Sequence, residues 1–73
     1  MRLATYEQVL RSLASNVRAA RLGLDLSQEE AAHRAGIAVR QWQRIESGTG
    51  VTLRTIVAVA SALGKDVPDL LRR

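Results

Sequence analysis

The chain of 73 residues is long enough for one small domain, whose folding buries only about 60% of the surface that its unfolded form exposes. It contains no cysteine and one histidine, which excludes a disulfide framework, a thiolate metal site and a cysteine nucleophile. Eleven basic residues against seven acidic ones give a net charge of +4, and ten of the eleven are arginines, whose guanidinium groups suit phosphates and guanine edges.

Hydrophobic residues make up 47% of the chain and aromatic ones 3%, so aliphatic side chains must build the core around Tyr6 and Trp42, as in closely packed helices. No segment approaches the roughly 18 apolar residues of a membrane span, and the N-terminus lacks the apolar stretch of a signal peptide. We therefore expect a soluble, cytoplasmic protein.

The first helix is predicted over residues 5–22, because apolar residues recur there at steps of three and four. These residues are Tyr6, Val9, Leu10, Leu13, Val17 and Ala20. Thr5 and Gln8 have the spacing of a capping box at its start.

The second helix is predicted to begin at Ser27 or Gln28. Ser27 and Glu30 have capping-box spacing, and Glu29 adds negative charge where the helix dipole favours it. The helix is short, because Gly36 supplies the positive φ angle that ends a helix sharply.

A third helix is predicted from about Val39 to Ser47, with Gly48 as its stop. Its N-cap position is poor, because Ala38 has no side-chain acceptor. We therefore expect packing to hold its first turn.

The fourth helix is predicted from a Thr52 cap to Leu63, where Gly64 closes it. Its segment TIVAVA is rich in β-branched residues, but the helical pattern persists for eleven residues. The expected inward face consists of Leu53, Ile56, Val57, Ala60 and Leu63.

A final helical turn is predicted after Asp66 as its cap, with Pro68 in its first turn and Leu70 and Leu71 pointing inward. The pattern as a whole predicts a single all-α domain over residues 1–73, a compact bundle of five helices.

Two short helices joined at a glycine form the layout of a helix-turn-helix, here over about residues 28–47. Small or apolar residues stand at Ala31, Ala32, Ala35, Ile37, Trp42 and Ile45. Ala32 is expected at the crossing of the two helices, where a larger side chain would push them apart.

A helical wheel with about 100° between residues places Trp42 and Ile45 on the inward side of the third helix. The residues that face the opposite way are Arg40, Gln43, Arg44 and Ser47. Arginine and glutamine side chains hydrogen-bond base edges and phosphates. The alternative is that these residues only form a solvated helix face.

The stretch LSQEEAAHRAGIAVRQWQRIESG followed by TLRTIVAVASALG resembles the Cro/C1 (XRE-type) helix-turn-helix regulators of phages and bacteria. The resemblance runs from about Val17 to Leu71, so residues 1–10 form an N-terminal extension beyond the minimal domain. It implies a five-helix, lambda-repressor-like domain that binds operator DNA, usually as a homodimer. Leu70 and Leu71 would then form the dimer contact, with the apolar side of the first helix as the alternative.

By that likeness, Val39, Arg40, Gln41 and Arg44 match positions that touch bases, and we add the outward Gln43 to this set. The residues predicted to contact phosphates are Gln28, Ser47, Thr52 and Arg54. Gln28 would also brace the third helix. Arg21 and Glu46 match a buried salt bridge that ties the first helix to the third.

The chain departs from the family pattern at several positions. Ala31 stands where leucine is common, and Trp42 replaces a smaller residue, so the simplest hypothesis is that the small side chain makes room for the large one. Asp25 replaces a common glycine, and Ala38 replaces a capping Ser or Thr that touches a phosphate.

Several residues have plain structural alternatives. Gln28 would then bond only within the protein, Arg54 would be an ordinary surface residue and His33 an exposed spectator. Arg72 and Arg73 would form a solvated tail.

The main functional hypothesis is a sequence-specific DNA-binding transcriptional regulator, a dimeric repressor of a palindromic operator that is associated with the nucleoid. The alternative is a DNA-binding antitoxin, or protein-interaction module, of a toxin pair. An enzyme is disfavoured, because no nucleophile set, phosphate loop or metal spacing appears, and no cofactor is expected.

Overall fold

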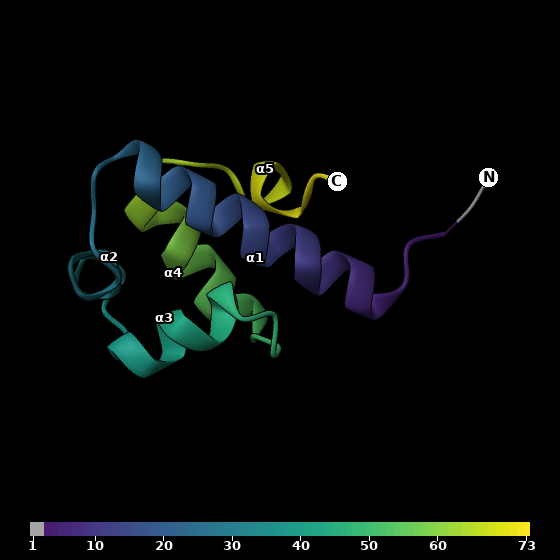
Figure 1. Cartoon of the computed structure of the whole chain (residues 1–73), viewed down its shortest axis with the longest axis horizontal. Coiled ribbons are helices and arrows are strands. Elements are labelled where there is room, and N and C mark those ends of the chain that lie inside the picture. The colour runs from purple at the N-terminus through teal and green to yellow at the C-terminus, as the bar shows by residue number, and fades with distance from the viewer. Residues whose placement is uncertain (1–2) are drawn as a thin grey trace.

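The computed structural model describes residues 3–73, and this part of the chain forms five α-helices and no strand (Figure 1). The helices are α1 (Tyr6–Gly23), α2 (Gln28–Ala35), α3 (Val39–Glu46), α4 (Leu53–Leu63) and α5 (Val67–Leu71). The all-α prediction is therefore confirmed. Residues 1 and 2 of the predicted N-terminal extension lie outside the described residues. Among the described helices, none combines the length and the apolar character that a membrane crossing requires.

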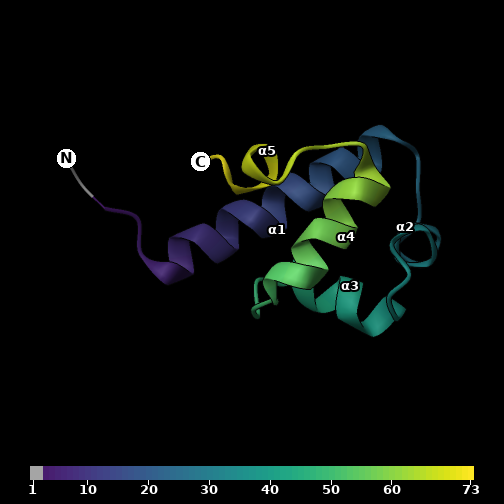
Figure 2. The same cartoon turned by 180° about the vertical axis from the view of Figure 1, so that it is seen from behind.

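The long α1 forms the spine of the bundle. Figures 1 and 2 show α5 along one side of α1 and α3 on the opposite side, with α4 packed between them. The bundle measures 39 × 20 × 18 Å, and its long dimension arises because the first turns of α1 project past the other helices. Helices α3 and α5 thus lie on different faces of the bundle.

Side chains from all five helices meet in one core. Its buried members are Leu13, Val17, Leu26, Ala31, Ala32, Trp42, Ile45, Val59, Ala60, Leu63 and Leu70. Trp42 is fully buried, so the single tryptophan lies at the centre, as predicted.

The predicted role of Tyr6 in the core is wrong, because the residue is 67% exposed. It lies on the first turn of α1, where that helix projects past the bundle (Figure 1). Its hydroxyl instead lies close to Gly50 in the loop between α3 and α4.

The predicted inward face of α4 is wrong for Leu53 and Val57, which are 71% and 53% exposed. Ala60 and Leu63 are buried as predicted, and Val59 is buried in place of Val57. Val57 and Val59 differ by two residues, or about 160° around a helix, so only one of them can face the core. Apolar residues cover so much of α4 that periodicity alone does not select the buried side.

The predicted helix ends are set by local hydrogen bonds. Thr5 with Gln8 and Ser27 with Glu30 both form complete capping boxes, as predicted. Thr52 caps α4, and Gly36 and Gly64 end α2 and α4 with left-handed backbone angles. Asp66 occupies the N-cap of α5, but its side chain makes no capping hydrogen bond, contrary to the prediction.

Asp25 adopts a left-handed backbone with a φ of 57°. Glycine adopts this conformation without steric cost, which explains why the family commonly has glycine at this position. We expect Asp25→Gly to raise the free energy of unfolding by up to about 1 kcal/mol, since relief of the left-handed strain exceeds the entropy cost of glycine. Asp25→Val should lower it, because a β-branched residue strongly resists positive φ. Urea denaturation followed by circular dichroism measures both. The explanation fails if Asp25→Gly is less stable than wild type.

Candidate nucleic-acid interface

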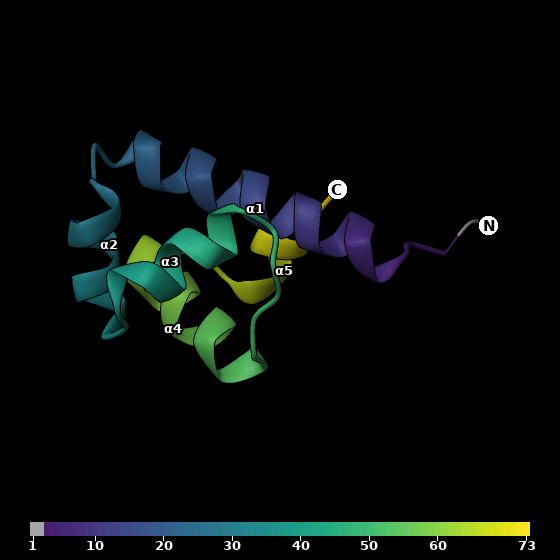
Figure 3. The same ribbon diagram turned by 60° about the horizontal axis from the view of Figure 1, so that its bottom comes forward.

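Helix α3 lies on the surface of the bundle with one side anchored inward. Trp42 and Ile45 are 0% and 4% exposed, which holds that side against the core. The outward residues Arg40, Gln43, Arg44 and Ser47 are all exposed. Figure 3 shows α3 at the front of the molecule, with α1 along one flank and α4 along the other. The outward polar face that the helical wheel predicts is therefore present.

Small residues allow α2 to pack closely against this helix. Ala31 and Ala32 are 0% and 1% exposed, so the crossing predicted at Ala32 lies within the core. After Gly36, the backbone N–H of Ile37 donates to the carbonyl of Ala32 at 3.1 Å and closes the turn. The turn and the small side chains together fix the direction in which α3 leaves α2.

The structure brings Arg21 of α1 and Glu46 of α3 together. The Nε atom of Arg21 donates to Oε2 of Glu46 at 2.6 Å, and its Nη2 donates to Oε1 at 3.1 Å. A further nitrogen of Arg21 donates to the carbonyl of Leu26 at 2.8 Å. The two charged side chains are only 10% and 6% exposed. This pair ties α1 to α3 beneath the outward face.

Glu46 also accepts hydrogen bonds from two other side chains. Nε2 of Gln28 donates to its Oε1 at 3.1 Å, and Nε1 of Trp42 donates to its Oε2. Sequence reasoning missed the bond from Trp42, although the two residues are four apart on one helix and therefore neighbours on its surface. One carboxylate thus joins α1, α2 and α3.

These donors decide the ionisation of Glu46. Burial alone would raise the pKa of its carboxyl group, but the hydrogen bonds from Arg21, Trp42 and Gln28 outweigh burial and lower it below the ordinary value. The hydrogen bond to Glu46 raises the pKa of Arg21 above its ordinary value. Both members of the pair are therefore charged at neutral pH.

Gln28 braces α3 from the start of α2. Besides its bond to Glu46, its Oε1 accepts a hydrogen bond from Nε2 of Gln43 at 3.3 Å. The bracing role implied by the resemblance is thus visible, whereas its phosphate contact stays a prediction. Gln43, which we predicted to touch bases, lies on the flank of α3 that faces α2.

Gln41 caps the helix on which it lies. Its Oε1 accepts a hydrogen bond from the backbone N–H of Ala38 at 3.0 Å, so the first turn of α3 is not held by packing alone. The spacing of three residues, which Thr5 and Gln8 share, was the signal that would have found it. Val39, on the same first turn of α3, is half-buried against the core, which leaves part of its side chain outward.

A hollow of about 420 Å³ lies on the other flank of α3, beside the start of α4. Its lining residues are Gln41, Arg44, Ile45, Thr49, Gly50, Val51, Thr52 and Thr55. The hydroxyl of Thr52 donates to that of Thr55 at 3.0 Å and accepts from its backbone N–H at 3.2 Å. Arg54 is exposed on the first turn of α4, at the positive end of the helix dipole.

The hydroxyl of Ser47 donates to the carbonyl of Arg44 at 2.8 Å, and that of Thr49 donates to the same carbonyl at 2.8 Å. These bonds satisfy the C-terminal end of α3. Ser47, predicted to contact a phosphate, therefore uses its hydroxyl proton within the protein.

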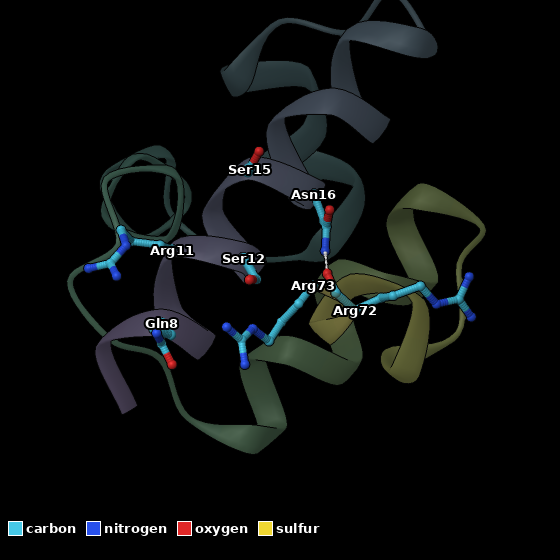
Figure 4. Close-up of a pocket in the computed structure, with 7 residues that line it drawn as sticks. All are labelled: Gln8, Arg11, Ser12, Ser15, Asn16, Arg72 and Arg73. Carbon is cyan, nitrogen blue, oxygen red and sulfur yellow. Dashed lines mark hydrogen bonds between the residues drawn. The ribbon is translucent and has the colours of Figure 1, made fainter. Parts of the chain in front are cut away.

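A polar hollow of about 400 Å³ lies between α1 and the end of α5 (Figure 4). The guanidinium groups of Arg11 and Arg72 point away from it in opposite directions, while that of Arg73 extends toward Gln8 and Ser12. Asn16 instead donates to the carbonyls of Leu70 and Arg72 at 2.9 and 2.7 Å, which fastens the end of α5 to α1. Sequence reasoning missed this role of Asn16.

Two other residues lie as their structural alternatives predict. His33 is exposed, and Arg72 is exposed apart from an ion pair with Asp69 at 3.0 Å. Over residues 3–73, no group of three His, Cys, Asp or Glu side chains is placed to hold a metal ion.

The chain is similar to known helix-turn-helix proteins. A family model described as helix-turn-helix matches residues 17–70. The chain is similar to the solved structure of a hypothetical transcription factor, NHTF, from Neisseria, with 29% identity and a TM-score of 0.85 over 99% of this chain and 84% of that one.

It is also similar to the apo form of the competence regulator ComR from Streptococcus vestibularis, with 31% identity and a TM-score of 0.77 over 86% of this chain. The chain spans only 22% of the length of that regulator. No curated protein matches the chain.

Proposed function

The chain belongs to the Cro/C1-type helix-turn-helix family of DNA-binding transcriptional regulators, and we propose that it represses transcription as a homodimer on a roughly palindromic operator. The observation that carries the proposal is the exposed arginine face of α3, a helix whose other side is anchored by Trp42 and Glu46. A helix of about 10–12 Å diameter fills a major groove about 12 Å wide. Anchoring therefore presents the same side chains to the groove in every encounter.

Within the groove, Arg40 and Arg44 read guanine through its O6 and N7 atoms. Val39 packs its exposed part on a thymine methyl group, while Gln41 and Gln43 reach adjacent base edges from the two flanks of α3. Gln28 and Arg54 bind the backbone phosphates, whereas Ser47 and Thr52 at the edges of α3 already donate their hydroxyl protons to Arg44 and Thr55. Support for this division comes from position: the first set lies on α3 alone, and the second lies around its edges.

We expect Arg40→Ala to cost about 1–3 kcal/mol on the preferred site and to relax base preference at one position. Arg54→Ala should weaken binding to all DNA sequences alike and reduce the slope of log K against log salt by about 0.9. Titrations on preferred and random duplexes at several salt concentrations measure both effects. Equal losses on both duplexes for both variants would contradict the division of roles.

We propose a dimer contact other than the two expected ones. Leu70 is 1% exposed in its own core, so it does not offer a surface to a second subunit. The middle of the apolar side of α1 is likewise covered, since Leu13 and Val17 are buried, whereas Tyr6 on its first turn is exposed. Leu53 and Val57, one turn apart on α4 and exposed, support an alternative contact along that helix.

Selection of bound sites from a random DNA pool tests the function as a whole. A palindrome with half-sites about 34 Å apart is the expected result. Enrichment of a single half-site would contradict the dimer, and no enrichment would contradict sequence specificity. A toxin partner remains a separate hypothesis, which co-purification of a neighbouring gene product with the native protein would favour.

A further inference from the structure

The polar hollow between α1 and the end of α5 takes no part in the DNA contacts proposed above (Figure 4). All of its lining residues lie outside residues 17–70, the segment that the helix-turn-helix family model matches. They belong to residues 8–16 of α1 and to residues 72–73, which follow α5. The hollow is therefore a feature of this chain that the shared domain does not account for.

The hollow lies on the face of the bundle opposite α3. Ser12, which lines it, precedes Arg21 by nine residues, or about 180° around a helix. Because Arg21 points at Glu46 of α3, Ser12 points the other way. Figures 1 and 2 agree, since they show α5 and α3 on opposite sides of α1. A macromolecule bound to α3 therefore leaves the hollow open.

Asn16 gives the hollow a fixed wall. Its Nδ2 atom donates to the carbonyls of Leu70 and Arg72 at 2.9 and 2.7 Å, which uses both N–H groups of the amide. Leu70 is also buried in the core, so the end of α5 is held twice. Arg73 follows directly and extends toward Ser12 on α1 (Figure 4). Its charge is thus placed beside the hollow by contacts with α1.

The hollow carries positive charge that the protein does not neutralise. Its lining includes Arg11, Arg72 and Arg73 but no aspartate or glutamate. Arg72 pairs with Asp69 at 3.0 Å. Within residues 3–73, Arg11 and Arg73 take part in no ion pair or side-chain hydrogen bond. Two guanidinium groups are therefore available to carboxylates, which they bind in charge-assisted pairs.

The directions of the arginines favour an extended ligand over a compact anion. The guanidinium groups of Arg11 and Arg72 point in opposite directions, and that of Arg73 takes a third (Figure 4). One phosphate group cannot meet all three, whereas a chain with several carboxylates can place one at each. Residues 11–16 also lie beyond the first turn of α1, so they lack the free backbone N–H groups with which helix N-termini bind phosphate.

Two hydroxyl groups add neutral donors between the charges. Ser12 and Ser15 lie one turn apart on α1, and both line the hollow. Within the described part of the chain, neither hydroxyl has a hydrogen-bond partner, and neither is closed off from solvent. Each can donate to a carbonyl of a chain that crosses α1. The hollow thus offers both charge and hydrogen bonds to a peptide.

We propose that this hollow binds an extended acidic segment of a partner protein. Carboxylates of the segment pair with Arg11 and Arg73, and Ser12 and Ser15 donate to its backbone carbonyls. The inference goes beyond the proposed function and does not depend on it. Together the two surfaces allow the protein to hold DNA through α3 and a partner on the opposite face at the same time.

The first test is a nuclear magnetic resonance titration of the isotope-labelled full chain with a peptide of alternating glutamate and serine. The amide signals of Arg11, Ser12, Ser15 and Arg73 should shift, and those of α3 should not. A peptide with glutamine in place of glutamate should shift none of them. Shifts centred on α3, or equal shifts with inorganic phosphate, would contradict the proposed ligand.

Variants of equal charge supply the second test. Loss of two exposed ion pairs in Arg11→Gln with Arg73→Gln should weaken binding of the labelled acidic peptide about tenfold at low salt. The matched control is Arg18→Gln with Arg34→Gln, which removes two exposed arginines outside the hollow. It should bind the peptide as wild type does. Equal losses in the two double variants would reduce the effect to general attraction by a basic protein and overturn the proposal.

The third measurement asks whether both faces work together. The acidic peptide should bind the complex of the protein with its selected duplex, forming a ternary complex in a fluorescence anisotropy titration. Displacement of the peptide by the duplex would show that the two share one surface, contrary to the proposal. If the protein selects no duplex, the proposed function is wrong, while the first two tests still decide on the acidic segment. Circular dichroism checks that all variants are folded.

Discussion

Glu46→Gln is expected to lower the free energy of unfolding by about 3–5 kcal/mol, because it leaves the buried charge of Arg21 without a partner. A domain of this size has a total stability of only about 4–11 kcal/mol, so the loss is a large share. The new amide keeps only one acceptor oxygen, so its NH₂ group faces N–H donors at one of the two positions, either Trp42 with Nε of Arg21 or Gln28 with Nη2 of Arg21. Chemical denaturation followed by circular dichroism measures the change. The control Glu7→Gln, at an exposed first-turn position of α1, should cost less than about 1 kcal/mol.

The same substitution should change how stability depends on pH. The pKa of Glu46 is lower in the folded protein than in the unfolded chain, so its contribution is present above the unfolded pKa, about 4.3, and is lost as the pH falls through the folded pKa. Wild type should therefore lose more stability on acidification than Glu46→Gln. The lowered pKa of Glu30, caused mainly by the backbone hydrogen bond from Ser27, acts in both proteins and cancels in the comparison. Parallel pH profiles would contradict the role given to Glu46.

Trp42→Ala is expected to cost about 3–5 kcal/mol, because it opens a cavity at the centre of the core. It also removes the hydrogen bond from the indole to Glu46. In the Trp42→Ala background, Ala31→Leu should recover part of the loss, since both positions are fully buried and the larger side chain fills space that the ring has left. Denaturation midpoints of the single and double variants measure this coupling.

Ala31→Leu in the wild-type background supplies the control. There it should destabilise by about 1–3 kcal/mol through overpacking against an intact tryptophan. The sign of its effect thus depends on residue 42. Additive costs in the double variant would show that the alanine does not make room for the tryptophan.

Local features of this chain follow from sequence alone. The capping boxes at Thr5 and Ser27 and the helix end at Gly36 each depend on residues a few positions apart, so spacing predicts them correctly. The outward face of α3 follows in the same way, because Trp42 and Ile45 leave only one side of a short helix to the core. The helix-turn-helix and its arginine face are therefore encoded within about twenty residues.

The tertiary structure decides which side chains are engaged within the protein. α4 is apolar over most of its surface, so only packing against the other helices selects Val59 over Val57. Tyr6 has the spacing of a core residue but lies where α1 has left the bundle. Glu46 collects donors from three helices, and Gln28, Gln43 and Arg18 meet beside it although they are distant in the chain. Such contacts depend on how the helices cross, and residue spacing within one helix does not determine that crossing.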